Sequence, residues 1–254
     1  MTGTPEAAAH WTVAGPVDGP PIVFVHGAMM GRSVWQPQID ALSDRYRCIT
    51  VDLPGHGTQR DSAFTLEIAA AGVLRAIDEA AGGRAVVVGS SLGGYTAMLV
   101  AGGHPDRVRG LVIAGSTREP SGVSSVAFQL YGWGLRLAPE PAVRVIAIAW
   151  FRRRYGTALG SAIVAGGHFA KGGGRAVLHL ARGQFRDRLK AYGGPILVIN
   201  GSMDLVFRIG AGRFLAGVPG VTQRMISRAG HLSNVDQPNA FTALVEDFIG
   251  TLGA

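Results

Sequence analysis

The chain has 254 residues, 47% of them hydrophobic and 16% charged, which suits one substantial core and leaves little room for two independent domains. Its single cysteine, Cys48, excludes an internal disulfide framework and is expected to be a small buried hydrophobe. The net charge of +7 is concentrated in one segment: Arg118 to Lys190 holds twelve basic against three acidic residues, and the rest of the chain has a net charge of −2.

A basic segment of this kind attracts anionic substrates, acidic proteins or nucleic acid. An arginine-rich solvated surface is the simpler interpretation, and nucleic acid is not expected as a partner because no recognition motif accompanies the charge. Residues 1–15 lack the basic start and apolar run of a secretory signal. No stretch of about eighteen apolar residues occurs, so we expect no membrane span and a cytoplasmic location.

Short apolar or β-branched runs recur along the chain and are typical of strands that are buried on both faces of a parallel sheet. They are Ile22–Val25, Cys48–Val51, Ala85–Val88, Gly110–Ala114, Pro195–Ile199 and Val221–Ser227. Segments of helical length separate or follow them: Val34–Arg45, Leu66–Ala80, Leu92–Gly103, Phe207–Ala216 and Ala240–Ile249. The alternation predicts an α/β fold, a mostly parallel sheet flanked by helices.

The alternation stops between about residues 121 and 191. This stretch has helix-prone segments at Ala142–Phe151 and Arg175–Lys190, glycine-rich joints, and no convincing strand. It is expected to be a helical insertion placed over the sheet.

The sequence Gly89-Ser90-Ser91-Leu92-Gly93 follows a predicted strand and begins a helix. A nucleophilic serine on such a sharp turn requires neighbours without side chains two positions away on either side. Ser91 meets this requirement, whereas Ser90 has Val88 and Leu92 at those positions. Ser91 is therefore the predicted nucleophile.

A serine hydroxyl needs a base, and the base needs a carboxylate that orients it. His231 follows the last predicted strand and is the predicted base, while Asp204 follows the strand before it and is the predicted acid. Both would lie at the carboxyl ends of strands, where open α/β sheets form their sites. Glu119, which follows an earlier strand, stays open as an alternative acid. Asp236 is expected to anchor a loop.

The chain resembles the α/β-hydrolases because it has several of their motifs in the order in which they occur in that family. These motifs are Phe24-Val25-His26-Gly27-Ala28, residues 51–57 (VDLPGHG), the turn at Ser91, the Asp204 loop and Gly230-His231. The resemblance implies an α/β-hydrolase fold with a core of residues 1–120 and 191–254 and a helical cap of residues 121–190. It also implies an oxyanion hole formed by the amides of Ala28 and Leu92, with Met29 as the fallback for Ala28.

The cap of such a protein usually forms the acyl pocket. Met29, Trp133 and Trp150 are expected to bind substrate, and other apolar cap side chains could join them: Phe128, Leu130, Tyr131, Leu135 and Phe151. His26 and His56 are expected to fix loops, and His168 or His179 could face the cleft. No cluster has metal-ligand spacing and no phosphate-binding glycine motif is present, so neither a metal nor a nucleotide cofactor is expected.

The predicted function is hydrolysis of a carboxylic ester, thioester or lactone through an acyl-serine intermediate. The substrate is expected to be a small acyl compound, and recognition of a carboxylate, a coenzyme A thioester or an acidic carrier protein by the basic cap is a sharper hypothesis. Two alternatives stay open. A cofactor-free lyase that resembles the menaquinone-pathway synthase would use the same triad, although Tyr95 stands where that family commonly has arginine. A non-catalytic ligand receptor on the same fold is the other.

Overall fold

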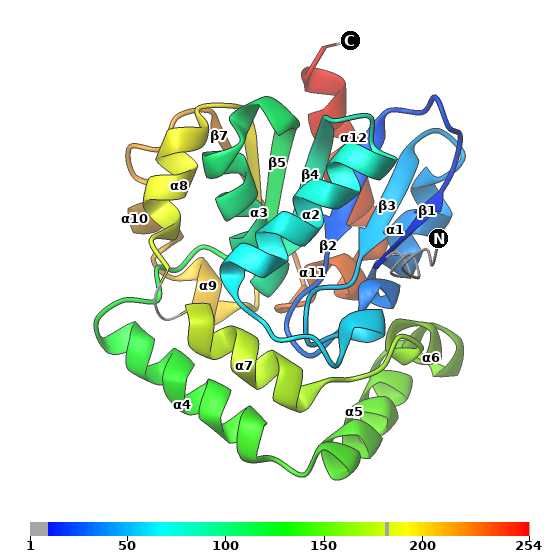
Figure 1. The fold of residues 1–254 in the computed structure, drawn as a ribbon, viewed down its shortest axis with the longest axis vertical. Coiled ribbons are helices and arrows are strands. Elements are labelled where there is room, and N and C mark those ends of the chain that lie inside the picture. The colour runs from blue at the N-terminus through cyan, green and yellow to red at the C-terminus, as the bar shows by residue number, and fades with distance from the viewer. Residues whose placement is uncertain (1–9, 181–182, 254) are drawn as a thin grey trace, which may run out of the picture.

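The computed structural model describes residues 10–180 and 183–253. Over these residues the chain forms one seven-stranded sheet in the order β1-β3-β2-β4-β5-β6-β7 (Figure 1). β1 runs antiparallel to β3, and the other neighbours are parallel. The strands are β1 (Trp11–Ala14), β2 (Pro21–Val25), β3 (Arg47–Val51), β4 (Ala85–Ser90), β5 (Val108–Ala114), β6 (Ile196–Gly201) and β7 (Val221–Ile226).

Helices cover both faces of the sheet and the end at which its parallel strands finish. They are α1 (Gln36–Leu42), α2 (Leu66–Ala80), α3 (Leu92–Gly103), α4 (Val123–Leu137), α5 (Glu140–Tyr155), α6 (Thr157–Val164), α7 (Ala170–Leu180), α8 (Phe185–Tyr192), α9 (Leu205–Arg208), α10 (Ala211–Leu215), α11 (Ser233–Asp236) and α12 (Pro238–Thr251), with 3-10 turns η1 (Arg32–Trp35), η2 (Gly57–Gln59) and η3 (Pro105–Arg107). In the part of the chain described, no helix combines the length and apolar character needed to cross a membrane.

The central strands are buried on both faces, so they are apolar at every position rather than at alternate ones. In β4, Val87 belongs to the core under α2, α3 and α8, while Val86 and Val88 belong to the core under α1 and α12. Burying each such side chain contributes roughly 1.5–3 kcal/mol. The two cores together fix the position of β4, and the turn at Ser91 follows this strand directly.

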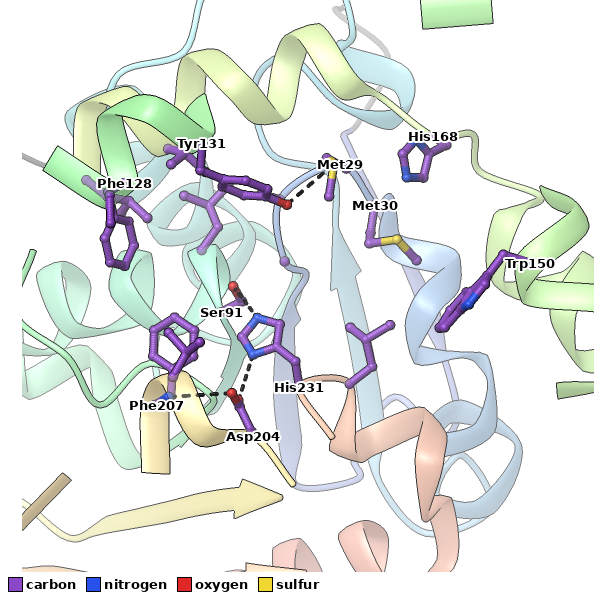
Figure 2. Close-up of a pocket in the computed structure, with 18 of the residues that line it drawn as sticks. Met29, Met30, Ser91, Phe128, Tyr131, Trp150, His168, Asp204, Phe207 and His231 are labelled. Carbon is purple, nitrogen blue, oxygen red and sulfur yellow. Dashed lines mark hydrogen bonds and ion pairs between the residues drawn. The ribbon is translucent and has the colours of Figure 1, made fainter. Parts of the chain in front are cut away.

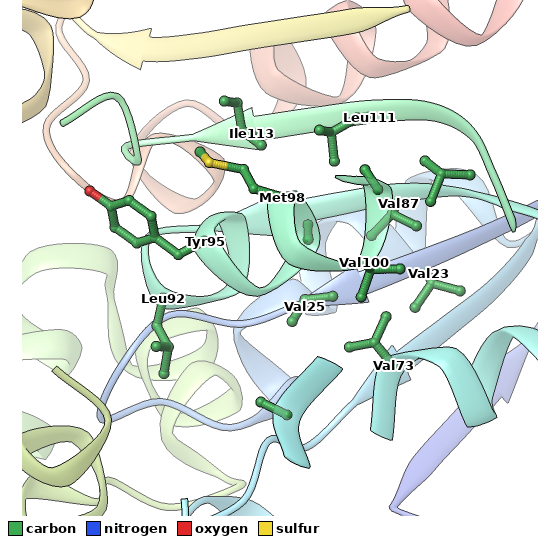
Figure 3. Close-up of a cluster of buried hydrophobic side chains, with 14 of the residues drawn as sticks. Val23, Val25, Val73, Val87, Leu92, Tyr95, Met98, Val100, Leu111 and Ile113 are labelled. Carbon is green, nitrogen blue, oxygen red and sulfur yellow. The ribbon is translucent and has the colours of Figure 1, made fainter. Parts of the chain in front are cut away.

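Helix α3 packs tightly on the sheet from its first turn. Figure 3 shows Tyr95, Met98 and Val100 of α3 among strand residues that include Val87 and Ile113. Leu92, Tyr95 and Met98 are fully buried. Because the start of α3 is held this firmly, the residue before it is held as well.

Helices α4 to α7 form a layer across the end of the sheet where β6 leads into α9 (Figure 1). Within this layer α4 packs against α7, and α5 packs against α6. Helix α8 packs against α3 instead and buries Phe185, Leu189 and Tyr192 in the sheet core. The division into a core and a cap of residues 121–190 remains a prediction.

Two predicted helices are interrupted in the structure. The segment 175–190 contains the end of α7 and most of α8, and the segment 207–216 contains the end of α9 and all of α10. The second break occurs at Ile209 and Gly210, where Gly210 has a φ of 89°. A positive φ ends a helix, and glycine adopts it without steric cost.

Candidate active site

Ser91 lies on the sharp turn between β4 and α3 and has backbone angles of φ 51° and ψ −117°. This conformation is rare for a residue with a side chain. It is held by close packing: a Cβ on Gly93 would lie 2.0 Å from the carbonyl oxygen of Val25, and a Cβ on Gly89 would lie 2.3 Å from the carbonyl oxygen of Gly93. Both glycines are therefore required sterically.

Two hydrogen bonds fix the backbone of Ser91 to the end of β5. The Ser91 amide donates to the carbonyl of Ala114 at 2.8 Å, and the Ser116 hydroxyl donates to the carbonyl of Ser91 at 3.0 Å. Ser116 was not singled out from the sequence, since a serine after a strand has no distinctive pattern. Ser90 is the last residue of β4 and is 3% exposed, whereas Ser91 lines an apolar cavity.

Ser91, His231 and Asp204 are brought together from three loops at the ends of β4, β7 and β6 (Figure 2). His231 Nδ1 lies 2.8 Å from Asp204 Oδ2, and His231 Nε2 lies 2.9 Å from Ser91 Oγ. A carboxylate only accepts hydrogen bonds, so Nδ1 carries the proton and Nε2 is the acceptor. The Ser91 hydroxyl therefore donates to His231, and His231 donates to Asp204.

Asp204 and His231 are positioned by α9, the short helix after β6. The Asp204 side chain caps this helix by accepting a hydrogen bond from the Phe207 amide at 3.5 Å. The Phe207 ring stacks on His231 with a centroid distance of 4.9 Å. Asp204 is 6% exposed, so its carboxylate faces the imidazole with little competition from water.

The other two carboxylates considered from the sequence serve local structure. Glu119 accepts hydrogen bonds at 2.9 Å from the amides of Phe185 and Arg186, and so caps the start of α8. Asp236 accepts a hydrogen bond at 2.7 Å from the amide of Gly230 and pairs with Arg154 at 3.0 Å. Neither carboxylate contacts His231. The geometry therefore favours Asp204 as the partner of the imidazole.

Ala28 and Leu92 line the same cavity as Ser91. Leu92 is the first residue of α3, so its amide has no acceptor inside the helix. In residues 10–180 and 183–253 neither amide has a hydrogen-bond acceptor. The Met29 amide, in contrast, donates to His56 Nε2 at 3.2 Å. This hydrogen bond favours Ala28 over Met29 as an oxyanion donor.

His26 and His56 hold the loops beside the site. His26 Nε2 accepts from the Leu53 amide at 3.0 Å, and its Nδ1 donates to the Gly27 carbonyl at 2.8 Å. Burial lowers the pKa of His26 below its usual value and lowers the pKa of His56 to about 3. Both imidazoles are therefore neutral at neutral pH, and in each ring the unprotonated Nε2 accepts a hydrogen bond from a backbone N–H.

The cavity beside Ser91 has a volume of about 540 Å³. Met29 and Trp150 line it, together with Phe128, Tyr131 and Phe151 from the helical layer. Trp133 does not line it, contrary to expectation: its side chain is 47% exposed, and the Arg136 guanidinium lies 5.0 Å from its ring centroid. Leu130 and Leu135 also lie outside the lining. Trp133 is two positions beyond Tyr131, so on α4 the two side chains point in different directions.

His168 also lines this cavity, whereas His179 packs against Phe64 with a centroid distance of 5.8 Å. No group of three or more His, Cys, Asp and Glu side chains that could bind a metal occurs among the residues that the structure describes.

The sequence matches the model of the alpha/beta hydrolase family over residues 22–244. The chain belongs to the α/β-hydrolase family. This assignment confirms the resemblance and the fold class predicted from the motifs. The match begins within strand β2 and spans the loops that hold Ser91, Asp204 and His231 and the helical layer α4 to α7.

Enzymes are similar to this α/β-hydrolase over nearly its full length. The 3-oxoadipate enol-lactonase 1 of Acinetobacter baylyi is 28% identical, over 94% of this chain and 92% of that protein. A pimeloyl-[acyl-carrier protein] methyl ester esterase of Stenotrophomonas maltophilia is 28% identical, over 92% of this chain and 94% of its own. The crystal structure of the enol-lactonase from Burkholderia xenovorans LB400 has a TM-score of 0.79 and 26% identity, covering 95% of this chain and 96% of that one. The chain is thus an enzyme of the α/β-hydrolase type.

Proposed function

We propose that this enzyme hydrolyses a carboxylic ester, thioester or lactone through an acyl-enzyme formed on Ser91. The observation that carries the proposal is the hydrogen-bonded series from Ser91 to His231 to Asp204, with distances of 2.9 and 2.8 Å. The names of the similar lactonases and esterases support the same class of bond. Serine as nucleophile also favours acyl transfer over chemistry that proceeds through an alkyl-enzyme ester.

In the proposed first step, Ser91 Oγ attacks the acyl carbonyl carbon while His231 Nε2 takes the hydroxyl proton. The tetrahedral intermediate collapses, the bond to the leaving group breaks, and His231 gives its proton to the leaving oxygen or sulfur. A water molecule then attacks the acyl-Ser91 carbonyl with His231 again as the base, which releases the acid and restores the serine. Asp204 keeps the imidazole in the required tautomer and stabilises its protonated form.

The amides of Ala28 and Leu92 are the proposed donors to the oxyanion of each tetrahedral intermediate. Neither amide has another acceptor in the described part of the chain, and both residues line the cavity that Ser91 lines, which supports this role. The amide of Leu92 also lies at the positive end of the α3 dipole. One such donor typically contributes a factor of about 10²–10³ in rate.

The cavity suits an apolar acyl group. Its lining includes Phe128, Tyr131, Trp150 and Phe151, and over the described residues no lysine or arginine contributes to it. A small acyl compound is therefore the proposed substrate, with Met29 and Trp150 among the residues that contact it. Any anionic or carrier-bound portion of the substrate would have to bind outside this cavity.

The proposal is tested by comparing Ser91→Ala with Ser90→Ala on a short p-nitrophenyl ester. Ser91→Ala is expected to lower kcat by a factor of about 10⁴ or more, because the nucleophile is lost. Ser90→Ala, on the adjacent buried serine, is expected to keep most of the activity. Circular dichroism and thermal unfolding would show whether both variants are folded. Normal turnover by a folded Ser91→Ala variant would disprove the acyl-serine mechanism.

A further inference from the structure

A second and larger hollow lies next to the acyl cavity and, unlike that cavity, is lined by several cations. Its volume is about 1110 Å³, and its walls come from α5, the start of α7 and the loop near η2. It is lined by four basic residues, Arg60, Arg144, Lys171 and Arg175, and by two acidic residues, Asp61 and Glu140. We call this hollow the basic groove.

Three of the four cations in the basic groove are available to a ligand. The Arg60 guanidinium lies 3.9 Å from the Asp61 carboxylate, so the positive charge of Arg60 is balanced by Asp61. Among the described residues, Arg144, Lys171 and Arg175 form no ion pair with a carboxylate. All three side chains are exposed to solvent. Cations from two helices that line one groove attract phosphate or carboxylate groups more strongly than isolated surface charges do.

His168 connects the basic groove to the acyl cavity, because its side chain lines both. The residue is 8% exposed, and its Nδ1 atom is buried without a hydrogen-bond partner within the described part of the chain. A buried polar nitrogen without a partner is unfavourable, and ligands commonly supply the missing contact. Burial also lowers the pKa of His168, so the ring is neutral and able to bond to an uncharged polar group.

We infer that the basic groove binds the anionic end of a phosphate-bearing leaving group, whose chain passes His168 to reach the acyl group beside Ser91. The inference rests on the proposed function, since it names the substrate class of the same site. The apolar cavity would hold the acyl portion, and the larger exposed groove would hold the polar portion. A thioester or ester of a phosphorylated thiol or alcohol has this division, and its leaving group can depart into solvent from the groove.

The test compares two thioesters that carry the same acyl group. Butyryl-coenzyme A has a phosphorylated leaving group, and butyryl-N-acetylcysteamine has a short neutral one. Wild-type enzyme is expected to have a higher kcat/KM for the coenzyme A ester, and this preference should shrink as salt is added. Lys171→Gln and Arg175→Gln are each expected to lower kcat/KM for the coenzyme A ester about two- to fivefold, the effect of one exposed charge contact, without changing that for the neutral ester.

Arg153→Gln is the matched control, because Arg153 is an exposed cation of α5 that does not line the groove. Arg153→Gln is expected to change kcat/KM for neither thioester. An equal effect of Arg153→Gln and the groove variants would mean general attraction by the basic surface and would overturn a specific site. Equal kcat/KM for both thioesters in wild-type enzyme would overturn the inference as well.

A third thioester separates a phosphorylated leaving group from an acidic acyl group. Glutaryl-N-acetylcysteamine carries a carboxylate on the acyl side only. If the groove variants impair this substrate and leave butyryl-coenzyme A unaffected, the assignment of the groove to the leaving group is wrong. The p-nitrophenyl ester keeps the two proposals apart. If Ser91→Ala abolishes its turnover while Lys171→Gln and Arg175→Gln leave kcat/KM for butyryl-coenzyme A unchanged, the inference fails and the acyl-serine proposal stands.

Discussion

Helices α3 and α4 face the same cavity and are packed in very different ways. Leu92, Tyr95 and Met98 of α3 are fully buried against the sheet. On α4, Phe128 and Tyr131 face the cavity, while Leu130 and Leu137 on its outer side are 70% and 78% exposed. The first helix begins directly after Ser91, the proposed nucleophile, and the second contributes only cavity wall.

This difference in packing corresponds to two separate requirements of the site: precise positioning of the reacting groups and a cavity wall that fits the substrate. The proposed acyl transfer needs Ser91, His231 and the proposed oxyanion donors held within a fraction of an ångström, and dense packing of α3 and β4 supplies this precision. Substrate binding needs a wall of suitable shape, which a helix packed mainly on α7 can supply. Substitutions in α3 should therefore affect folding and chemistry, whereas those on α4 should affect mainly the choice of substrate.

The greatest loss of activity is expected on changing the carboxylate that contacts His231. Asp204→Asn is expected to lower kcat by roughly 10⁴, because an amide at this position favours the wrong imidazole tautomer. Glu119→Gln is the matched amide substitution and is expected to keep kcat near that of the wild type, since Glu119 caps α8. Steady-state kinetics on a p-nitrophenyl ester check both. A large loss of kcat in Glu119→Gln together with a small loss of kcat in Asp204→Asn would make Glu119, not Asp204, the acid of the triad.

The contrast in packing between α3 and α4 should also appear in the free energy of unfolding. Met98→Ala removes a fully buried side chain and is expected to lower the free energy of unfolding by about 2–5 kcal/mol. Leu130→Ala removes a side chain that is 70% exposed and is expected to change it by less than about 0.5 kcal/mol. Urea denaturation monitored by fluorescence measures both. Similar losses in the two variants would contradict the contrast between the helices.

The smallest effect concerns the pH dependence of stability. Burial holds the pKa of His56 at about 3, against 6.5 for an exposed histidine. Below pH 6.5 the unfolded chain therefore binds a proton at this residue that the folded chain does not, so this contribution to stability falls as pH falls from 6.5 toward about 3. His56→Gln should reduce the slope of stability against pH by up to about 1 kcal/mol per pH unit.

The control for this measurement is His104→Gln, which replaces an exposed histidine. Urea unfolding of both variants between about pH 7 and about pH 4.5 gives the two slopes. If His104→Gln flattens the curve as much as His56→Gln does, then burial of His56 is not the source of the pH dependence.

The sequence predicts the parallel sheet and the residues that meet at its edge because these depend on strong local patterns. Apolar runs locate the central strands, and the glycines around Ser91 reflect contacts that only a residue without a side chain allows. The loops of Asp204 and His231 follow from the order of the strands. For the same reason α2 and α3 have the predicted bounds of Leu66–Ala80 and Leu92–Gly103.

The remaining features depend on tertiary contacts that no local pattern records. Strand β1 is a short edge strand of mixed burial, held by pairing with β3, and was not predicted. Helix α4 was not predicted either, although it forms part of the cavity wall. The exposure of Trp133 depends on the direction in which α4 presents each side chain. His168 lines both the acyl cavity and the basic groove because segments far apart in the chain pack around it.

In the proposed mechanism, His231 activates Ser91, which attacks an acyl carbon. The most direct measurement is reaction with a fluorophosphonate probe, followed by mass spectrometry of the labelled peptide. The predicted result is one adduct per chain, on Ser91, which forms in wild type and in Ser90→Ala but not in Ser91→Ala, and which slows sharply in His231→Ala. An adduct on Ser90, or labelling of Ser91 at an undiminished rate without His231, would disprove activation of Ser91 by His231.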